Sequence, residues 1–450
     1  MSELKRAPTG ASTNASTAAP PRARLPRTVK ALAAVSFFTD ASSEMIYPLL
    51  PAFLTATLGA SAAWVGIIEG AADATASLLK LASGWWSDRV KRRKPLIVAG
   101  YTIAAVLRPL VAVAGAAWQV LAIRVGDRMG KGIRGAPRDA MIADAVASNE
   151  RGRAFGAQRA ADHAGAFVGP LIAFVLLQWV GVTVRTVFLL AAIPGALAVL
   201  VAVFGVREAD GRRRTEDGRE QRAEGGGRTA DSGRQTADGG RQRAEGGEQS
   251  TNARPTSRAD ATTVAPLGGN FWRYLAVLVL FTLGNSTDAF LLLKASELGV
   301  SAALLPILWA ALHVVKSATS IPAGAWSDRV GRRTMIAAGW LWYALVYLGF
   351  ALATETWHAW ALFLSYGLFF GLTEGVERAL VADLVPATRR GLAFGWYNGV
   401  IGAAVLPASV AFGLMWDWKG SGFAFMVGAA SACLAAVGLV LVRPARTATN

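Results

Sequence analysis

The stretch RVGDRMGKGIRGAPRDA, residues 124–140, places charged side chains at helical spacing within an otherwise apolar region. At about 100° per residue, a helix would gather them on one face, within an arc of about 140°. Charges inside a bilayer are costly unless they are paired or face water, so this face predicts ion pairs or a water-filled cavity. The members of this charged ladder are Arg124, Asp127, Arg128, Lys131, Arg134, Arg138 and Asp139.

The bases of the ladder suit the binding of an anion. Arginine pairs well with carboxylate and phosphate, so Arg124, Arg128 and Lys131 favour an anionic or zwitterionic metabolite as a bound solute. For the last third of the ladder, from residue 134 onward, solvation at the membrane rim is the alternative explanation.

Acidic side chains in other apolar stretches complement these bases. Burial of a carboxyl group in a dry cavity raises its pKa towards neutrality, which suits proton binding and release. We therefore expect Asp40, Glu44 and Asp73 to be the first proton carriers, followed by Glu374 and Glu377. Structural ion pairs are the alternative for part of this set. The further charged candidates for solute or proton binding are Glu69, Asp162, Asp288 and Arg378.

Two histidines, His163 and His313, also lie within apolar stretches. Histidine suits a proton relay because its ordinary pKa lies near neutrality, and hydrogen-bonded packing is the alternative. The histidines are far apart in sequence and Cys433 is the only cysteine, so we expect neither a metal site nor an enzyme's catalytic set. The sequence also lacks a P-loop lysine motif, so ATP is not expected as an energy source.

Long apolar runs must position these residues. The chain has 450 residues, of which 53% are hydrophobic and 17% charged, whereas a soluble domain carries about 25% charged residues. Runs of about 20 apolar residues recur along it, which is the length that crosses a bilayer as a helix. The sequence therefore predicts an all-α membrane protein of twelve spans. They are expected at 31–55, 63–83, 95–115, 118–141, 154–178, 186–206, 271–294, 301–323, 334–354, 358–380, 392–414 and 422–442.

The connecting segments indicate how the spans are oriented. Alternate connections are basic, and the intervening ones near 56–62 and 115–118 carry no charge. The positive-inside rule then places both termini in the cytoplasm. The net charge of +16 is explained by this distribution, so no nucleic-acid partner is expected. We expect a multi-pass protein of the plasma membrane, which is the inner membrane in a Gram-negative cell.

Residues 207–270 separate two groups of six spans. This segment is rich in Gly, Arg, Asp and Glu, and it cannot bury enough apolar surface to offset chain entropy. We interpret it as a disordered cytoplasmic linker that acts as a tether, with a regulatory role as the alternative. The predicted organisation is a disordered basic cytoplasmic tail at 1–30, six-helix bundles at 31–206 and 271–443, and a cytoplasmic tail at 444–450.

The two halves repeat short motifs. GWWSDRVKRR at 84–93 recurs as GAWSDRVGRR at 324–333, and DAVASNERGRAFG at 144–156 recurs as DLVPATRRGLAFG at 383–395. An even number of spans separates the copies, so both copies face the cytoplasm. The sequence predicts two pseudo-symmetric bundles in parallel orientation, with a solute site between them at mid-membrane and two alternately open states.

These motifs resemble the major facilitator superfamily, and the resemblance covers everything except the tail and the linker. The family signature G-x-x-x-D-R-x-x-R-R, between the second and third spans, matches at both copies, although Lys91 stands where glycine is usual. The resemblance implies that these residues close the cytoplasmic side and do not touch the solute; arginines that merely hold the loop inside are the alternative. The gating residues would be Gly84, Asp88, Arg89, Arg92, Arg93, Gly324, Asp328, Arg329, Arg332 and Arg333.

The fifth span, GAQRAADHAGAFVGP, is similar to the family's antiporter motif, which is typical of exporters that exchange their substrate for protons. Its glycines allow close helix contact and its proline permits a bend. The match is partial, because Ala173 and Phe174 replace the usual closing glycines, and a generic packing seam is the alternative. The matching residues are Gly156, Gly165, Gly169 and Pro170.

Together these features predict a secondary active transporter that works by alternating access. The leading expectation is proton-coupled efflux, by antiport, of a small amphipathic or toxic compound. The alternatives are import or export of an anionic or zwitterionic metabolite, and a non-transporting membrane receptor, against which the many mid-membrane acids argue. We expect a monomer in lipid that uses the proton gradient and no cofactor.

Overall fold

The computed structural model describes residues 25–87, 92–147, 150–208, 267–386 and 389–440. The described residues form helices and no strand, which confirms the all-α fold class. Within these described residues, eight helices or consecutive helix pairs are long and apolar enough to cross a membrane. The predicted first, second, fourth and eighth spans are not among these eight. The first and second contain acids, the fourth contains the charged ladder, and the eighth contains His313.

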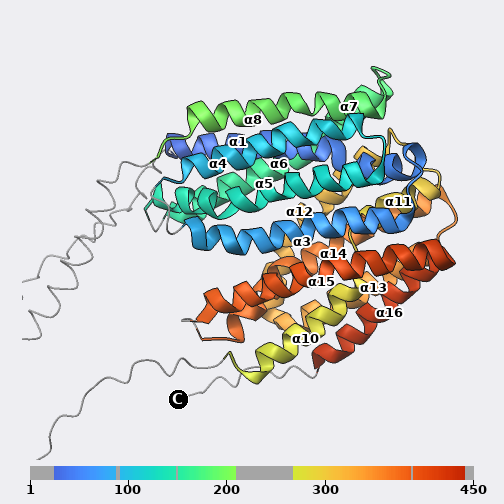
Figure 1. Ribbon diagram of the computed structural model, residues 1–450. Coiled ribbons are helices and arrows are strands. Elements are labelled where there is room, and N and C mark those ends of the chain that lie inside the picture. The colour runs from blue at the N-terminus through green and yellow to red at the C-terminus, as the bar shows by residue number, and fades with distance from the viewer. Residues whose placement is uncertain (1–24, 88–91, 148–149, 209–266, 387–388, 441–450) are drawn as a thin grey trace, which may run out of the picture.

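The first half runs from α1 to α8 (Figure 1). Its first span continues through short irregular turns, and the third and sixth spans are each made of two consecutive pieces. The elements are α1 Arg27–Ile46, η1 Tyr47–Leu49, α2 Leu50–Ala52, η2 Phe53–Thr57, α3 Ala62–Ser87, α4 Lys94–Leu107, η3 Arg108–Val113, α5 Ala117–Asp144, α6 Arg151–Gln178, α7 Val184–Leu190 and α8 Ala192–Gly205.

The second half runs from α10 to α16. Its first span is interrupted between α10 and α11, and two of its tight turns depend on glycine. Gly331 (φ +96°) joins α12 to α13 and Gly420 (φ +84°) joins α15 to α16, and only glycine adopts such a backbone without strain. The elements are α10 Gly269–Gly284, α11 Ala289–Glu297, α12 Leu305–Val330, α13 Arg332–Leu352, α14 Thr356–Asp383, α15 Arg390–Lys419 and α16 Ser421–Val440.

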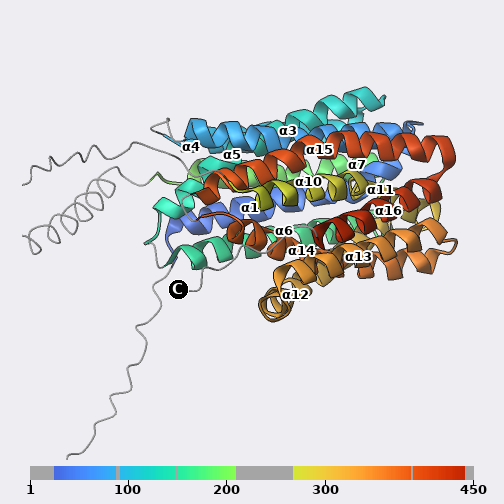
Figure 2. The same cartoon turned by 90° about the horizontal axis from the view of Figure 1, so that it is seen from below.

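The two halves repeat the same pattern of helix packing. In the first half α1 packs on α6 and α8, α5 packs on α3 and α4, and α4 packs on α8. In the second half the corresponding pairs are α10 with α15 and α16, α14 with α12 and α13, and α13 with α16. The halves meet where α3 packs on α15 and where α6 packs on α12 (Figures 1 and 2). The sequence duplication is therefore matched by a duplication of the packing.

Close contact between α3 and α15 depends on small residues. A Cβ atom at Gly66 would lie 2.1 Å from the Ser409 carbonyl oxygen, and one at Gly413 would lie 2.7 Å from Ala62 backbone oxygen. Glycine is required at both positions, because any side chain would push the two helices apart. The contact continues towards the other ends of the two helices, where a Cβ atom at Gly402 would lie 2.5 Å from that of Ser77.

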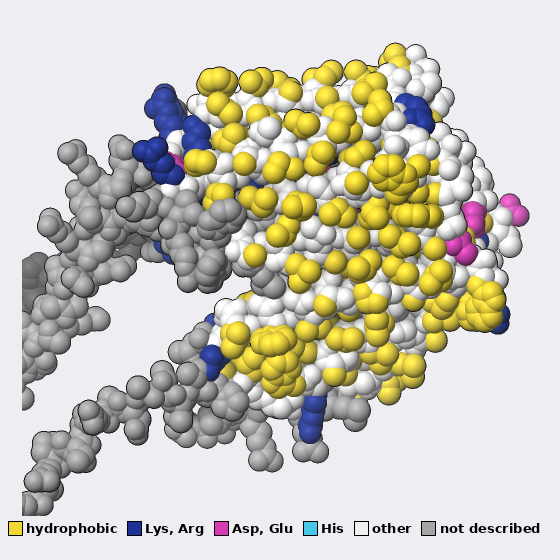
Figure 3. Space-filling model, viewed as in Figure 1, with side chains coloured by type: hydrophobic (Ala, Val, Ile, Leu, Met, Phe, Trp, Pro, Cys, Tyr) yellow, Lys and Arg dark blue, Asp and Glu magenta, His cyan; other side chains and the backbone are white. Residues whose placement is uncertain are grey.

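The bundle has two distinct ends. The start of α1, the end of α8, the start of α10 and the end of α16 all lie at one end, which we call the linker end (Figure 1). At the linker end the surface is notched between the two halves (Figure 3). At the opposite end the two halves are in contact, as described below.

Candidate functional site

A cavity of about 260 Å³ lies between the two halves. The first half contributes Tyr47 and Asp73, and the second half contributes α10, the segment that follows it, α14 and α15. Four carboxylates line the cavity, and among the described residues no lysine, arginine or histidine does. The acids are Asp73, Asp288, Glu374 and Glu377. A polar chamber between two apolar bundles is suited to holding a small solute.

The wall of the cavity includes a break in the seventh span. Helix α10 ends at Gly284 and α11 begins at Ala289, so the backbone in between is not helical. Side chains from neighbouring helices satisfy part of this backbone: Tyr343 donates to the Gly284 carbonyl (3.2 Å), and the Thr287 N–H donates to Ser409 (3.3 Å). Irregular backbone at membrane depth is tolerated where it lines a cavity, and it brings Asp288 to the cavity wall. Tyr366 donates a 2.7 Å hydrogen bond to Asp288.

Glu377 is a buried carboxylate held by two neutral donors. Trp340 Nε1 donates to one of its oxygens and Tyr397 Oη donates to the other, each at 3.0 Å. The side chains come from α13, α14 and α15, so three helices fix this acid. Its charge has no basic partner within the described residues.

Glu374 lies one turn away from Glu377 and is paired with bases instead. Lys316 Nζ lies 2.9 Å from one Glu374 oxygen, and Arg378 lies 3.5 Å from the other. Lys316 also lies over the ring of Phe370, at 4.1 Å from its centroid. Two neighbouring acids on α14 therefore have opposite surroundings, one charged and one neutral.

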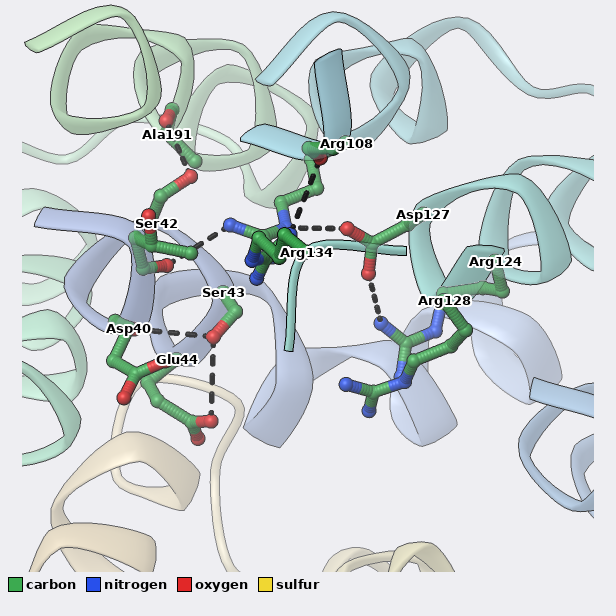
Figure 4. A network of polar contacts seen from close by, with 12 residues as sticks. Asp40, Ser42, Ser43, Glu44, Arg108, Arg124, Asp127, Arg128, Arg134 and Ala191 are labelled. Atoms are coloured by element: carbon green, nitrogen blue, oxygen red, sulfur yellow. Dashed lines mark hydrogen bonds and ion pairs between the residues drawn. The ribbon is translucent and has the colours of Figure 1, made fainter. Parts of the chain in front are cut away.

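The first half contains a buried ion-pair network on α3, η3 and α5, and Figure 4 shows its members Arg108, Arg124 and Asp127. Arg124 binds both oxygens of Glu69, at 2.8 and 2.7 Å, and its third nitrogen lies 3.7 Å from Asp127. Arg108 donates to Asp127 at 2.9 Å and to the Thr39 carbonyl at 2.9 Å. All four charged side chains are at most 5% exposed. For Arg124, Asp127 and Glu69 the structure thus favours structural ion pairing over contact with a solute.

Arg108 was not among the predicted site residues. It lies in AAVLRPLVAV, where a single arginine interrupts a long apolar run before a proline. A charge at that depth requires a buried partner, and this isolated base was the signal that could have identified it.

The other residues of the ladder differ in their partners, and among the described residues none of them lines the cavity. Arg128 Nε lies 3.8 Å from Asp73, and Lys131 is exposed without an ion pair in the described part of the chain. Arg134 is 5% exposed, so rim solvation does not explain it; it bonds the Gly100 carbonyl and lies over Tyr101, at 4.3 Å. Arg138 pairs with its neighbour Asp139 at 2.9 Å, where both side chains are partly exposed.

The other predicted acids form no ion pair with the described residues. Asp40 is half-buried, and its carboxylate has neither an ion pair nor a hydrogen bond to the described residues. Glu44 accepts a hydrogen bond from Trp309 Nε1 at 2.8 Å, and Asp162 accepts one from Gln158 at 2.6 Å.

The two predicted histidines lie on α6 and α12, which pack together, but no hydrogen bond joins them in the described part of the chain. His163 is exposed on α6. His313 on α12 packs edge-on against Trp309, with ring centroids 5.0 Å apart, and its buried Nε2 has no hydrogen-bond partner among the described residues. These contacts favour packing for His313.

The glycine motif of the fifth span lies partly against α1. A Cβ atom at Gly165 would lie 2.3 Å from the Phe37 carbonyl oxygen, and one at Gly169 would lie 2.4 Å from that of Ala41. Pro170 follows within α6, whereas Gly156 meets nothing within 4 Å. Two of the three glycines therefore form a close helix contact within the first half.

The predicted gating residues are only partly described. Asp88 and Arg89 lie outside the described residues, and the surroundings of Gly84, Gly324 and the Asp328 side chain are not described either. Of the arginines, Arg92 and Arg329 are exposed. Arg93 pairs with Asp144 at 2.5 Å, Arg332 pairs with Asp383, and Arg333 donates to the Leu439 carbonyl at 2.8 Å. These contacts join helices of the same half, and gating remains a prediction.

The contacts that join the two halves lie at the end opposite the linker end. Asp417, near the end of α15, accepts hydrogen bonds from the backbone N–H groups of Ala62 and Ala63 at the start of α3, each at 2.9 Å. The bond from Trp309 to Glu44 also crosses between the halves. A carboxylate at a helix N-terminus is stabilised by the unpaired N–H groups there. The halves are thus closed at this end and separated at the linker end.

Comparison with known proteins places this geometry in context. The family model described as Major Facilitator Superfamily matches residues 32–315 and 274–450. An uncharacterised MFS-type transporter of Methanocaldococcus jannaschii is 29% identical over 87% of this chain and 89% of its own. The multidrug resistance protein MdtH of Cronobacter sakazakii is 33% identical over 30% of this chain and 33% of its own.

Solved structures share the fold at low sequence identity. A POT family transporter in complex with 5-aminolevulinic acid has a TM-score of 0.69 and 12% identity, covering 92% of this chain and 96% of its own. A D-xylose-proton symporter has a TM-score of 0.67 and 17% identity, covering 93% and 97% of the two chains. At this identity the likeness concerns the fold.

Proposed function

Because the chain belongs to the Major Facilitator Superfamily and is a multi-pass membrane transporter, not an enzyme, we propose that it exports a small amphipathic compound in exchange for protons. The observation that carries this proposal is the cavity between the halves, lined by carboxylates from both of them. The halves join at one end and separate at the other, which suits rocking between two open states. The proposed setting is the plasma membrane, with the protein as a monomer and the proton gradient as the energy source.

The proposed proton carriers are two of the carboxylates that lack a basic partner among the described residues. Asp73 and Glu374 each face a base, so their negative charges are already balanced. Asp40 and Glu377 have none within the described residues. An unbalanced carboxylate in a low-dielectric interior gains most from taking up a proton. We therefore assign coupling to these two acids, one in each half.

Export is proposed as the direction of transport because of two likenesses. The fifth-span motif resembles that of proton-coupled exporters, and Gly165 and Gly169 make the close contact with α1 that such a motif requires. The partial similarity to MdtH, whose name denotes multidrug resistance, supports the same direction.

A second candidate is the transport of an anionic or zwitterionic metabolite. Lys131 is exposed and without an ion pair in the described part of the chain, and Arg128 faces Asp73 only at 3.8 Å. These two bases favour an anion, whereas Arg124 is fully engaged by acids.

Proton flux in inverted membrane vesicles tests the proposal. Addition of a transported compound is expected to release protons from acidified vesicles that contain the wild-type protein. Asp40→Asn and Glu377→Gln are each expected to abolish this release, because an amide cannot carry the proton. Asp139→Asn is the matched control, since that acid is paired with Arg138 and does not line the cavity. Full proton release by both variants would rule out the assignment.

A further inference from the structure

We propose that the central cavity recognises an amphipathic organic cation, whose charged group binds Asp288 while its apolar part packs on the aromatic wall. This inference rests on the proposed function, because it names the class of solute for the same cavity. It favours a cation over the anion that the charged ladder suggests.

The first argument is the balance of charge around the cavity. Asp73 faces Arg128 at 3.8 Å, and Glu374 is paired with Lys316 and Arg378. Asp288 and Glu377, by contrast, contact only neutral donors among the described residues. Since no base lines the cavity there, an excess of negative charge remains for a bound cation to balance.

The second argument distinguishes Asp288 from Glu377. Both oxygens of Glu377 are occupied by donors, and the residue is 8% exposed. Asp288 has one oxygen bonded to Tyr366, which leaves the other oxygen without a partner among the described residues. Ser286 lies two residues away and lines the same cavity, and the residue is 4% exposed. The helix break thus presents a free carboxylate oxygen to a ligand.

The third argument is the aromatic wall. Phe281, Phe369 and Phe370 line the cavity beside Asp288. A cation near an aromatic ring face is stabilised by the ring's charge distribution, and Lys316 Nζ already lies 4.1 Å from the Phe370 ring centroid. The same rings give an apolar body a surface to pack on. The wall therefore suits a ligand that combines an aromatic or alkyl body with a charged amine.

Equilibrium binding to the purified full-length protein in detergent tests this inference. The probes are 4-phenylbutylammonium, the neutral 4-phenylbutanol and the anionic 4-phenylbutyrate, each of which joins a phenyl ring to its polar group through a short alkyl chain. We expect the ammonium to bind about tenfold or more tightly than the other two, as a charge-assisted hydrogen bond would give. Asp288→Asn should remove that preference and leave the affinity for the alcohol unchanged, and Asp288→Glu should retain it. Asp139→Asn is the control that should change nothing.

The amide of Asp288→Asn still accepts from Tyr366, so the fold should persist. Should that variant not yield folded protein, Tyr366→Phe carries the test, because it frees the second carboxylate oxygen and should strengthen binding of the ammonium alone. The inference would be overturned if the butyrate bound more tightly than the ammonium. It would also be overturned if neither Asp288→Asn nor Tyr366→Phe changed the affinity for the ammonium.

The binding test is separate from the test of transport. Ammonium binding that depends on Asp288, without proton release in vesicles, would leave cation recognition intact and refute only the coupling. Proton-coupled movement of an anion, without ammonium binding, would refute cation recognition and leave the proton coupling intact.

Discussion

At the scale of single residues, the interior of the first half contains charged side chains, whereas the interior of a soluble protein is mostly apolar. Arg124 donates two hydrogen bonds to Glu69, and Arg108 and Asp127 extend this buried network. Removing one member of a buried pair leaves the other uncompensated, which costs far more than the pair itself contributes. The second half uses aromatic rings in the equivalent interior, where Phe281 stacks on Trp340 with centroids 4.6 Å apart.

Arg124→Gln is therefore expected to lower the free energy of unfolding by about 3 kcal/mol or more, because Glu69 would remain buried without its partner. Arg138→Gln, whose partner Asp139 is 40% exposed, should cost less than about 1 kcal/mol. Thermal unfolding of the two variants in the same detergent compares these losses. Adding Glu69→Gln to the first variant should restore part of the loss; equal losses for the two single variants would contradict the role of the network.

At the scale of helices, the structure holds one end of the molecule closed through Asp417. Its carboxylate accepts from two N–H groups at the start of α3, and no other carboxylate among the described residues joins the halves through a helix N-terminus. The close contacts at Gly66 and Gly413 lie on the same pair of helices. This end should open when these contacts are weakened.

We expect Asp417→Asn to shift the protein towards the state that is open opposite the linker end, since the variant loses one acceptor and the favourable charge. An effect of about 1 kcal/mol would change the ratio of states roughly fivefold. Distances between spin labels placed across that end, in a Cys433→Ser background, would measure it. Glu297→Gln is the matched control, because that acid bonds Trp416 within the same half. An unchanged distance distribution in Asp417→Asn would show that the contact does not hold this end closed.

The helices were predictable from sequence to a greater extent than their contacts. Apolar runs of bilayer length gave ranges that coincide with the observed helices, with the largest difference at the eighth, which extends to Val330. The break after Gly284 was not predicted, although Gly-Asn is a common helix end, because the run 271–294 is apolar on both sides. The partners of Arg124 and Glu377 depend on which helices pack together, and local sequence patterns do not predict that packing.

At the scale of the whole molecule, two bundles with the same internal packing enclose a cavity lined with acids. Because α3 packs on α15 and α6 on α12, the proposed rocking of the two halves would take place at these two seams. The opening at the linker end and the closure at the other end describe one of two such states (Figure 3). A rigid pair of bundles that exposes the cavity alternately explains why charged residues are retained at this depth.

The accessibility of the cavity from each side tests this account most directly. Ile401 lines the cavity on α15, so Ile401→Cys in a Cys433→Ser background offers a single thiol there. A membrane-impermeant maleimide is applied to right-side-out and to inverted vesicles. The account predicts labelling from both sides, with a cavity ligand slowing both reactions. Labelling from one side only under every condition, or from neither side, would contradict alternating access.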